Sequence, residues 1–316
     1  MSLVCFGEAL IDFLSDGKEP ESFTKYAGGA PANVAVAAAR QGVDASFCGM
    51  VGDDMFGHFI KSALAQYNVN CDYVKMTDKA KTALAFVSLD DTGERSFSFY
   101  RPPAADLLFK AEDFAEAMFD AHSLLHVCSN SLTENSIYKT TTYALTQARE
   151  HGMHTSFDMN LRENLWTSLN HCIKRIWHVI SLSDIVKLSH EELLFLNQQS
   201  HSAHSLSHTI EAIIAANVKL LIVTDGKNPI HFYGQSYHNT INVPDVNAVD
   251  TTAAGDAFVG GLLAAIIRAQ NEQSIDAFLT SQSAVSSAIS YASRCGAYAV
   301  TRYGAFDSLP SFEDVE

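Results

Sequence analysis

Short apolar runs alternate with longer segments of helical periodicity along most of the chain. The apolar runs, which have the length of buried strands, are residues 3–6, 45–51, 123–128, 154–158, 185–188 and 219–224. Helical patterns occupy residues 32–41, 56–67, 136–151, 190–197 and 207–217, and a long helix is expected after Gly255. This alternation predicts a mainly parallel sheet covered by helices on both faces. Ligands of such sheets bind beyond the carboxyl ends of the strands.

One stretch departs from this alternation. Residues 82–89 and 95–101 are rich in β-forming side chains, and they flank the turn-forming residues 90–94. The pattern predicts a β-hairpin, which we expect to form a small sheet with residues 11–14 and 23–26. Such a sheet is either a lid over an active site or a surface hairpin that adds stability or an oligomer contact, and the pattern leaves both interpretations open.

The two patterns predict a discontinuous main domain and a smaller β lid. The main α/β domain is expected to comprise residues 1–10, 28–81 and 104–316. The lid is expected to comprise residues 11–27 and 82–103.

Composition and charge narrow the class of protein. The 316 residues are 47% hydrophobic and 18% charged, which is typical of a folded chain and excludes disorder. Lys and Arg total 21 against 36 Asp and Glu, a formal charge of −15. An acidic surface repels nucleic acid and anionic lipid, so neither is an expected partner.

Nothing in the sequence predicts a membrane segment or a disulfide framework. The longest run of apolar residues and glycine is 257–267, which is shorter than the roughly 20 residues that span a bilayer. The six cysteines are dispersed and form no CxxC pair. We therefore expect a cytoplasmic protein with reduced thiols.

The most informative segment is residues 250–258, with the sequence DTTAAGDAF, at the start of the last long helix. Its small residues leave unpaired backbone N–H groups accessible to an anion, which the helix dipole favours. Asp256 lies in the first turn, where a carboxylate can accept a proton from an attacking hydroxyl. An isolated Asp at a helix start more often only complements the dipole, and the neighbouring small residues favour anion binding instead.

Two segments near the amino terminus suit a polyol. Gly28 and Gly29 precede the alanine-rich helix that contains Asn33, whose amide both donates and accepts hydrogen bonds. Asp12 follows the first strand and can hold adjacent hydroxyl groups. Each segment also has a purely structural interpretation, as a glycine turn before a helix and as a loop Asp that bonds its own backbone.

Three further polar segments follow predicted strands. Residues 158–162 bring a cation to the sheet edge. Residues 187–192 contain two glutamates, which either only complement the dipole at a solvated helix start or include one that holds magnesium through water. Residues 223–227 form a strand and turn that can border a nucleotide, although any turn of an α/β fold has a similar pattern.

The sequence lacks the motifs of several other enzyme classes. It has no P-loop, no GxGxxG after a strand, no zinc-protease helix and no GxSxG.

Together these segments resemble the ribokinase-like family of carbohydrate kinases, and within it the bacterial and plant fructokinases. The resemblance runs nearly end to end. It is carried by GEALIDF, GGAPANVAVAAARQG, VGDDMFG, KTALAFVSLDDTGERSFSFYRPPAADLL, FDMNLRENLW, VKLSHEELLFL, VDTTAAGDAFVGG and AVTRYGA. The pair formed by DTTAAGD and the GG…N segment is the most specific part.

The resemblance implies a fold, a reaction and its cofactors. The fold is a ribokinase-like three-layer α/β/α domain with a mainly parallel sheet and a small β-sheet lid, through which several members form homodimers. The reaction is phosphorylation of the 6-hydroxyl of D-fructose by ATP, with Mg²⁺ and with K⁺ as activator.

The resemblance also assigns roles to residues of this chain. Asp256 is the implied base, and the backbone amides of Ala253, Ala254 and Gly255 form the implied anion hole. The implied sugar-binding residues are Asp12, Gly28, Gly29, Asn33, Phe97, Arg101, Asn160 and Arg162. The implied nucleotide-binding residues are Thr224, Gly226, Gly255 and Ser293, the last standing where fructokinases commonly have Asn. Glu192 is implied to organise magnesium through water, and the monovalent cation site consists of Asp250, Thr252, Ala299, Arg302, Gly304 and Ser308.

Several alternatives stay open at this point. Aminoimidazole riboside kinases share nearly all these motifs, and Phe97 can stack on a base-like ring or shape a sugar pocket. Ribose, or a keto-deoxy sugar acid recognised through Arg101 or Arg162, is a further alternative substrate. A catalytically silent sugar sensor is the alternative from another class, although the presence of Asp256 and Glu192 argues against it.

Overall fold

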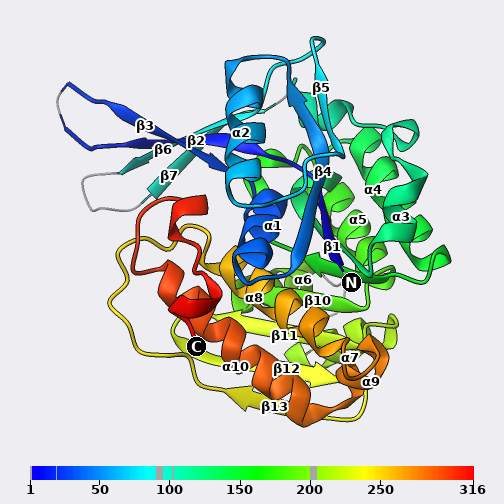
Figure 1. The fold of residues 1–316 in the computed structure, drawn as a ribbon. Coiled ribbons are helices and arrows are strands. Elements are labelled where there is room, and N and C mark those ends of the chain that lie inside the picture. The colour runs from blue at the N-terminus through cyan, green and yellow to red at the C-terminus, as the bar shows by residue number, and fades with distance from the viewer. Residues whose placement is uncertain (1, 19, 90–94, 102, 200–204) are drawn as a thin grey trace.

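The computed structural model describes residues 2–18, 20–89, 95–101, 103–199 and 205–316, without the side chains of residues 88, 89 and 95–97. Two separate sheets are visible in Figure 1. The larger sheet lies in the body of the molecule, and the smaller sheet extends from its side.

The larger sheet has the order β13-β12-β11-β10-β9-β8-β1-β4-β5. Its strands are β1 (Ser2–Phe6), β4 (Asp44–Gly52), β5 (Val74–Thr77), β8 (Leu124–Cys128), β9 (His154–Asp158), β10 (Ile185–Ser189), β11 (Leu220–Asp225), β12 (Asn228–Gly234) and β13 (His238–Ile241). All neighbours from β5 to β11 are parallel, whereas β12 and β13 are antiparallel. The carboxyl ends of the parallel strands therefore lie along one edge.

Helices cover both faces of this sheet, and two hydrophobic clusters separate them from it. One cluster packs α1 (Ala30–Arg40), α2 (Met55–Gln66), α8 (Ala254–Ala269), α9 (Ile275–Thr280) and α10 (Gln282–Ala299). The other packs α3 (Glu116–Ala121), α4 (Asn135–Glu150), α5 (Leu169–Ser181), α6 (His190–Gln199) and α7 (Leu206–Ala215). The chain thus forms the predicted three layers.

The smaller sheet has the order β3-β2-β6-β7. Its strands are β2 (Leu10–Ser15), β3 (Phe23–Gly28), β6 (Leu84–Leu89) and β7 (Arg95–Tyr100), so the four segments grouped from the sequence pair with one another. We call it the side sheet. Both β2 and β3 continue into the body through residues that reach the carboxyl edge of the larger sheet (Figure 1).

Close packing of α1 against α8 joins the two chain segments that bear the most specific motifs. A Cβ added at Gly260 would lie 2.3 Å from the Cβ of Ala37, a distance that real side chains do not tolerate. The small residues on both helices therefore allow their backbones to approach. Within the described ranges, none of the helices has the length and apolar character needed to cross a bilayer.

Candidate active site

A cavity of about 320 Å³ lies at the carboxyl edge of the larger sheet, beside the side sheet. We call it the polar cavity. Residues from both sheets and from α1 and α8 line it, including Asp12, Asn33, Phe99 and Asp256. Segments from the two ends of the chain thus meet in one place, as expected for this sheet architecture.

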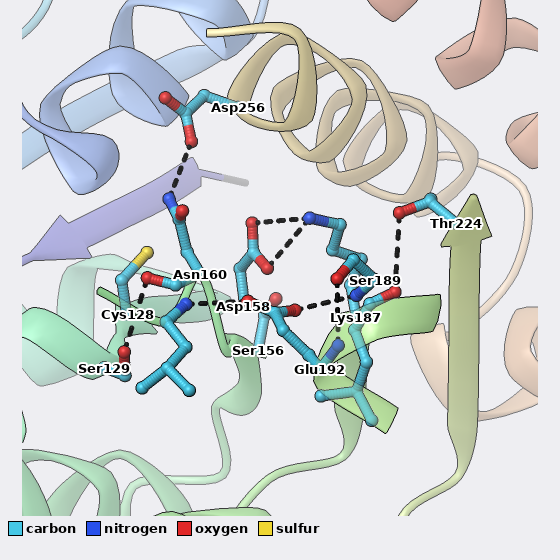
Figure 2. A network of polar contacts seen from close by, with 12 residues as sticks. Cys128, Ser129, Ser156, Asp158, Asn160, Lys187, Ser189, Glu192, Thr224 and Asp256 are labelled. Atoms are coloured by element: carbon cyan, nitrogen blue, oxygen red, sulfur yellow. Dashed lines mark hydrogen bonds and ion pairs between the residues drawn. The ribbon is translucent and has the colours of Figure 1, made fainter. Parts of the chain in front are cut away.

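Asp256 lies in the first turn of α8 with a side chain that is 6% exposed. Its Oδ2 accepts a hydrogen bond of 2.7 Å from Asn33 Nδ2, and its Oδ1 accepts one of 3.3 Å from Asn160 Nδ2. Figure 2 shows the contact with Asn160. Two amides from different elements therefore hold the carboxylate in one orientation at the cavity wall.

Burial raises the pKa of Asp256 above its usual value of 3.8. The hydrogen bond from Asn33 and the positive charges of Lys187 and Arg162 oppose this rise. A carboxylate with a raised pKa is a better proton acceptor than an exposed one, as a general base requires.

The backbone before Asp256 has the shape that the motif predicted. Ala253 is the N-cap residue of α8 and has a left-handed conformation with φ of 58°. Ala254 and Gly255 begin the helix, where backbone N–H groups have no partner within the helix. Ala253 and Gly255 line the polar cavity, so an anion there meets these amides and the positive end of the helix dipole.

Lys187 is a cavity residue that the sequence analysis did not assign. Its Nζ lies 3.1 Å from Asp158 Oδ1 and 3.2 Å from Asp158 Oδ2, and both side chains are almost fully buried (Figure 2). A Cβ added at Gly255 would lie 3.2 Å from this Nζ, which places the ammonium group beside the start of α8. The neighbouring carboxylates raise the pKa of Lys187 in spite of its burial. It therefore supplies a fixed positive charge next to the first backbone amides of α8.

The glycine pair Gly28–Gly29 allows the chain to pass close to two acidic residues. Gly29 has a φ of 107°, and a Cβ there would lie 2.6 Å from the backbone oxygen of Glu8. A Cβ at Gly28 would lie 2.2 Å from Asp12 Oδ2. Asp12 and Gly29 both line the polar cavity. Only glycine fits at these positions without displacing the cavity wall.

One expected sugar contact, Arg101, lies away from the lining of the polar cavity, and the other, Phe97, has a side chain outside the described residues. Arg101 is 2% exposed and donates from Nε to Asp106 Oδ2 at 2.9 Å and from Nη1 to Thr133 Oγ1 at 3.2 Å. It is not among the described residues that line the polar cavity, and Asp106 binds its guanidinium, so its contact with the sugar stays a prediction. The side chain of Phe97 lies outside the described residues, whereas Phe99 on the same strand lines the cavity.

The loop after β9 brings the remaining expected sugar contacts. Asn160, with φ of 36°, and Arg162 both line the polar cavity. Glu192 at the start of α6 holds this loop, because its Oε1 accepts from the backbone N–H of Leu161 at 2.6 Å and its Oε2 from that of Ser189 at 2.7 Å (Figure 2). Each carboxylate oxygen retains a second lone pair for water.

A second, more apolar cavity of about 510 Å³ adjoins the first. All four expected nucleotide residues line it, namely Thr224, Gly226, Gly255 and Ser293. Thr251 and Gly255 line both cavities, so the two spaces meet at the start of α8. This arrangement leaves room for one ligand on each side of the first backbone amides of α8.

The residues expected to bind a monovalent cation are gathered near Asp250. Its Oδ1 accepts from the N–H of Thr252 at 2.7 Å, and its Oδ2 accepts from the N–H of Gly304 at 3.3 Å. The N–H of Arg302 donates to the carbonyl of Ala299, and Ser308 Oγ donates to the carbonyl of Ala305. The group offers carboxylate, carbonyl and hydroxyl oxygens, which are the donors that hard cations prefer.

Comparisons with known proteins show which family and which solved structures the chain resembles. A model of the pfkB family of carbohydrate kinases matches residues 1–311. A fructokinase of Vibrio alginolyticus is 38% identical over 305 residues, which are 96% of this chain and 94% of that protein. The crystal structure of a fructokinase with bound ATP from Xylella fastidiosa has a TM-score of 0.94 and 42% identity, covering 99% of this chain and 96% of that one.

A third similar protein is a double-mutant fructokinase from Vibrio cholerae O395, solved in a form that binds fructose, ADP and a potassium ion. Its TM-score is 0.88 at 34% identity, and the match covers 100% of this chain and 99% of that one. These similarities confirm the expected ribokinase-like fold with a smaller separate sheet.

Proposed function

Because the chain belongs to the pfkB family of carbohydrate kinases, we propose that it transfers the γ-phosphoryl group of ATP to the 6-hydroxyl of D-fructose. The observation that carries this proposal is the position of Asp256. Its buried carboxylate faces the polar cavity one residue after Gly255, where that cavity meets the apolar one.

As the site of the acceptor sugar, the polar cavity suits a neutral polyol better than a sugar acid. Its charged lining residues are Glu8, Asp12, Asp158, Asp256, Arg162 and Lys187. Acids outnumber bases, and Lys187 is already paired with Asp158. A sugar acid would meet net repulsion there, which disfavours the keto-deoxy sugar acid as substrate.

In the proposed reaction, Asp12 and Asn33 orient the sugar and Asp256 accepts the proton of its 6-hydroxyl. The sugar oxygen then forms a bond to the γ-phosphorus while the bond from that phosphorus to the bridging oxygen of ADP breaks. The amides of Ala253, Ala254 and Gly255, with the charge of Lys187, stabilise the phosphoryl oxygens during transfer.

The nucleotide is proposed to lie in the apolar cavity, with its phosphates directed to the start of α8. Thr224, Gly226 and Ser293 border that cavity, which supports their assignment. Mg²⁺ would arrive with the nucleotide and offset the charge of its phosphates. Glu192 is proposed to hold a magnesium-bound water, since its oxygens keep lone pairs beyond the two backbone N–H groups.

We also propose a structural K⁺ beside the anion hole. Asp250 and Thr252 immediately precede Ala253, and the segment with Ala299, Arg302, Gly304 and Ser308 packs against them. An ion there would fix the loop whose amides contact the phosphate. The similar Vibrio cholerae protein was solved with potassium, which supports the choice of ion.

The side sheet is proposed to be a lid that excludes water from the transfer. The lid would comprise residues 11–27 and 82–103, and the main domain residues 1–10, 28–81 and 104–316. Phe99 from β7 lines the polar cavity, which supports this role. Exposed Phe23 and Tyr100 on the side sheet also favour a homodimer formed through it, which light scattering would test.

We further propose a cytoplasmic location for the protein. ATP is its proposed second substrate, and all six cysteines have unpaired thiols. Cell fractionation with an antibody to the protein would check this location.

A substrate panel tests the proposed reaction directly. ADP release is measured with fructose, ribose, aminoimidazole riboside and keto-deoxygluconate, and we expect the highest kcat/KM with fructose. A higher value with aminoimidazole riboside would assign the chain to the alternative reaction, in which Phe99 stacks on the ring. Sugar binding without ADP release would instead indicate a sensor.

A further inference from the structure

Glu8 and Asn130 form a buried pair in the wall of the polar cavity that the proposed mechanism does not use. Glu8 is 0% exposed and Asn130 is 7% exposed, and both line this cavity. Asn130 Nδ2 donates to Glu8 Oε1 at 3.0 Å. This contact leaves Glu8 Oε2 and Asn130 Oδ1 without a hydrogen-bond partner among the described residues.

The sheet topology explains why the two side chains meet. Glu8 follows β1 and Asn130 follows β8, and these parallel strands are neighbours with Phe6 opposite Val127. Between β1 and Glu8 lies Gly7, with φ of 150°, where an added Cβ would lie 2.7 Å from the side chains of Pro31 and Ser131. A glycine is therefore needed to turn the chain so that Glu8 reaches the cavity.

Glu8 Oε2 and Asn130 Oδ1 are buried acceptors that need a hydrogen-bond donor. A buried acceptor without a partner destabilises the folded protein, because it has lost its hydrogen bonds to water. Native proteins contain few such groups, and those facing a cavity are satisfied when a ligand enters it. An occupant with one hydroxyl hydrogen directed at Glu8 Oε2 satisfies the more costly of the two, since a carboxylate binds a donor more strongly than an amide does.

Arg101, which follows strand β7 of the side sheet, influences the pKa of Glu8. Burial raises the pKa of Glu8, and the positive charge of Arg101, which follows β7, opposes that rise. Arg101 is held in place by Asp106 and Thr133. In the described part of the chain, Asn130 alone among side chains donates a hydrogen bond to this buried carboxyl group.

We propose that Glu8, supported by Asn130, is a specificity-determining residue that accepts a hydrogen bond from one non-reacting hydroxyl of the sugar. The proposal rests on the proposed sugar kinase function and adds a contact to those of Asp12 and Asn33. It implies that the cavity selects sugars by a hydroxyl remote from the transferred phosphoryl group. A furanose that lacks this hydroxyl leaves the buried oxygens unsatisfied and binds less tightly.

The test combines two substitutions with fructose analogues. Wild type, Glu8→Leu and Glu8→Gln are assayed with D-fructose, with its 1-, 3- and 4-deoxy analogues and with 2,5-anhydromannitol, which lacks the 2-hydroxyl. In wild type, we expect one analogue to have a kcat/KM lower by about 10- to 100-fold, the loss of one charge-assisted hydrogen bond. Glu8→Leu should show the same loss with fructose and no further loss with that analogue. Glu8→Gln should recover part of the activity, because an amide still meets a hydroxyl.

The controls separate binding from folding. The KM for ATP should stay within about twofold in every variant, and thermal unfolding reports the stability of each. Asp184 is a buried residue that directly precedes β10, at the amino ends of the parallel strands and away from the polar cavity. Its Oδ2 accepts a hydrogen bond from the backbone N–H of Thr155 at 2.9 Å. Asp184→Asn should lower stability and leave the ratio between fructose and every analogue unchanged. If Glu8→Leu does not fold, Glu8→Gln alone carries the comparison.

The possible outcomes distinguish the proposed role of Glu8 from the proposed substrate, fructose. Loss of activity in Glu8→Leu by the same factor for fructose and for all analogues would overturn the role of Glu8, because a structural residue affects every substrate equally. Absence of fructose turnover by wild type would instead overturn the proposed substrate. In that case the same comparison is made with deoxy analogues of whichever sugar the panel identifies.

Discussion

Asn33 donates a hydrogen bond of 2.7 Å to Asp256, although 223 residues separate them in the chain. The contact exists because α1 and α8 pack closely through small residues such as Ala37 and Gly260. One helix thus brings a proposed sugar-binding amide and the other brings the proposed base. The bond also fixes one oxygen of the carboxylate, so that Oδ1 is directed to Asn160.

Replacing Asp256 by Asn should lower kcat by roughly 10²–10⁴-fold, the range for loss of a general base. The KM values for fructose and ATP should change little, because an amide of the same shape still contacts Asn33. The measurement is steady-state kinetics, with thermal unfolding as the check on folding. Turnover close to wild type would remove Asp256 from the reaction.

The rate should fall as the pH decreases through the pKa of Asp256, because the protonated carboxyl cannot accept the hydroxyl proton. Burial raises this pKa above 3.8, and the charge of Lys187 lowers it. Lys187→Met removes the positive charge, so the acidic limb of the kcat profile should move to higher pH. The exposed Lys139 on α4 provides the control, since Lys139→Met should leave the limb in place. If the acidic limb of Lys187→Met stays in place or moves to lower pH, the limb does not report the ionisation of Asp256.

Replacing Glu192 by Gln should lower activity by roughly 10- to 100-fold, as observed for residues that support a metal site. The amide NH₂ cannot accept from a backbone N–H, so either Leu161 or Ser189 loses its partner. The apparent activation constant for Mg²⁺ should rise, and EDTA should abolish activity in both proteins. An unchanged Mg²⁺ titration with a lowered kcat would restrict Glu192 to holding the loop.

Replacing Asp250 by Asn should reduce activation by K⁺ about tenfold, the effect of losing one charge-assisted contact. The expected measurement is the ratio of kcat in potassium chloride to kcat in tetramethylammonium chloride. The hydrogen bonds to Thr252 and Gly304 involve both carboxylate oxygens, so the unfolding transition must be measured as well. A wild-type enzyme indifferent to K⁺ would refute the cation site.

Arg101→Met should lower the free energy of unfolding by about 3–5 kcal/mol, because it leaves the buried carboxylate of Asp106 without its partner. The double variant Arg101→Met, Asp106→Leu removes both charges and should recover most of this loss. Urea unfolding at constant pH gives both values. Equal stability of the single and double variants would argue against a stabilising ion pair.

Much of the fold could be predicted because its strands and helices have strong hydrophobic patterns. The predicted strand at 154–158 coincides with β9, and the hairpin at 82–101 with β6 and β7. The helix α10 (Gln282–Ala299) was not predicted, because its buried face consists largely of alanine, serine and cysteine, which give weak contrast. The hairpin of β12 and β13 was missed because exposed polar residues alternate along a sheet edge.

The site was predictable where one motif contains all the groups, as in residues 250–256. Lys187 and Glu8 were missed because each depends on a neighbouring strand end, and a single sequence does not pair strands. Lys187 lies within a buried strand, where an isolated charge is unusual, and that burial was the available signal. The ion pair of Arg101 was missed for a similar reason, since its partner Asp106 follows after a turn that the pattern did not predict.

The contact between Ala37 and Gly260 has a consequence for the timing of catalysis. Helices packed this closely resist sliding past one another, so we expect the amide of Asn33 and the carboxylate of Asp256 to stay aligned when ligands enter or leave. The proposed base is therefore already oriented before the ligands bind. If Asp256 is the base, the occupant of the space in front of it decides whether water or the sugar hydroxyl receives the phosphoryl group. In its proposed role as a lid, the side sheet would keep water out of that space and so prevent the hydrolysis of ATP.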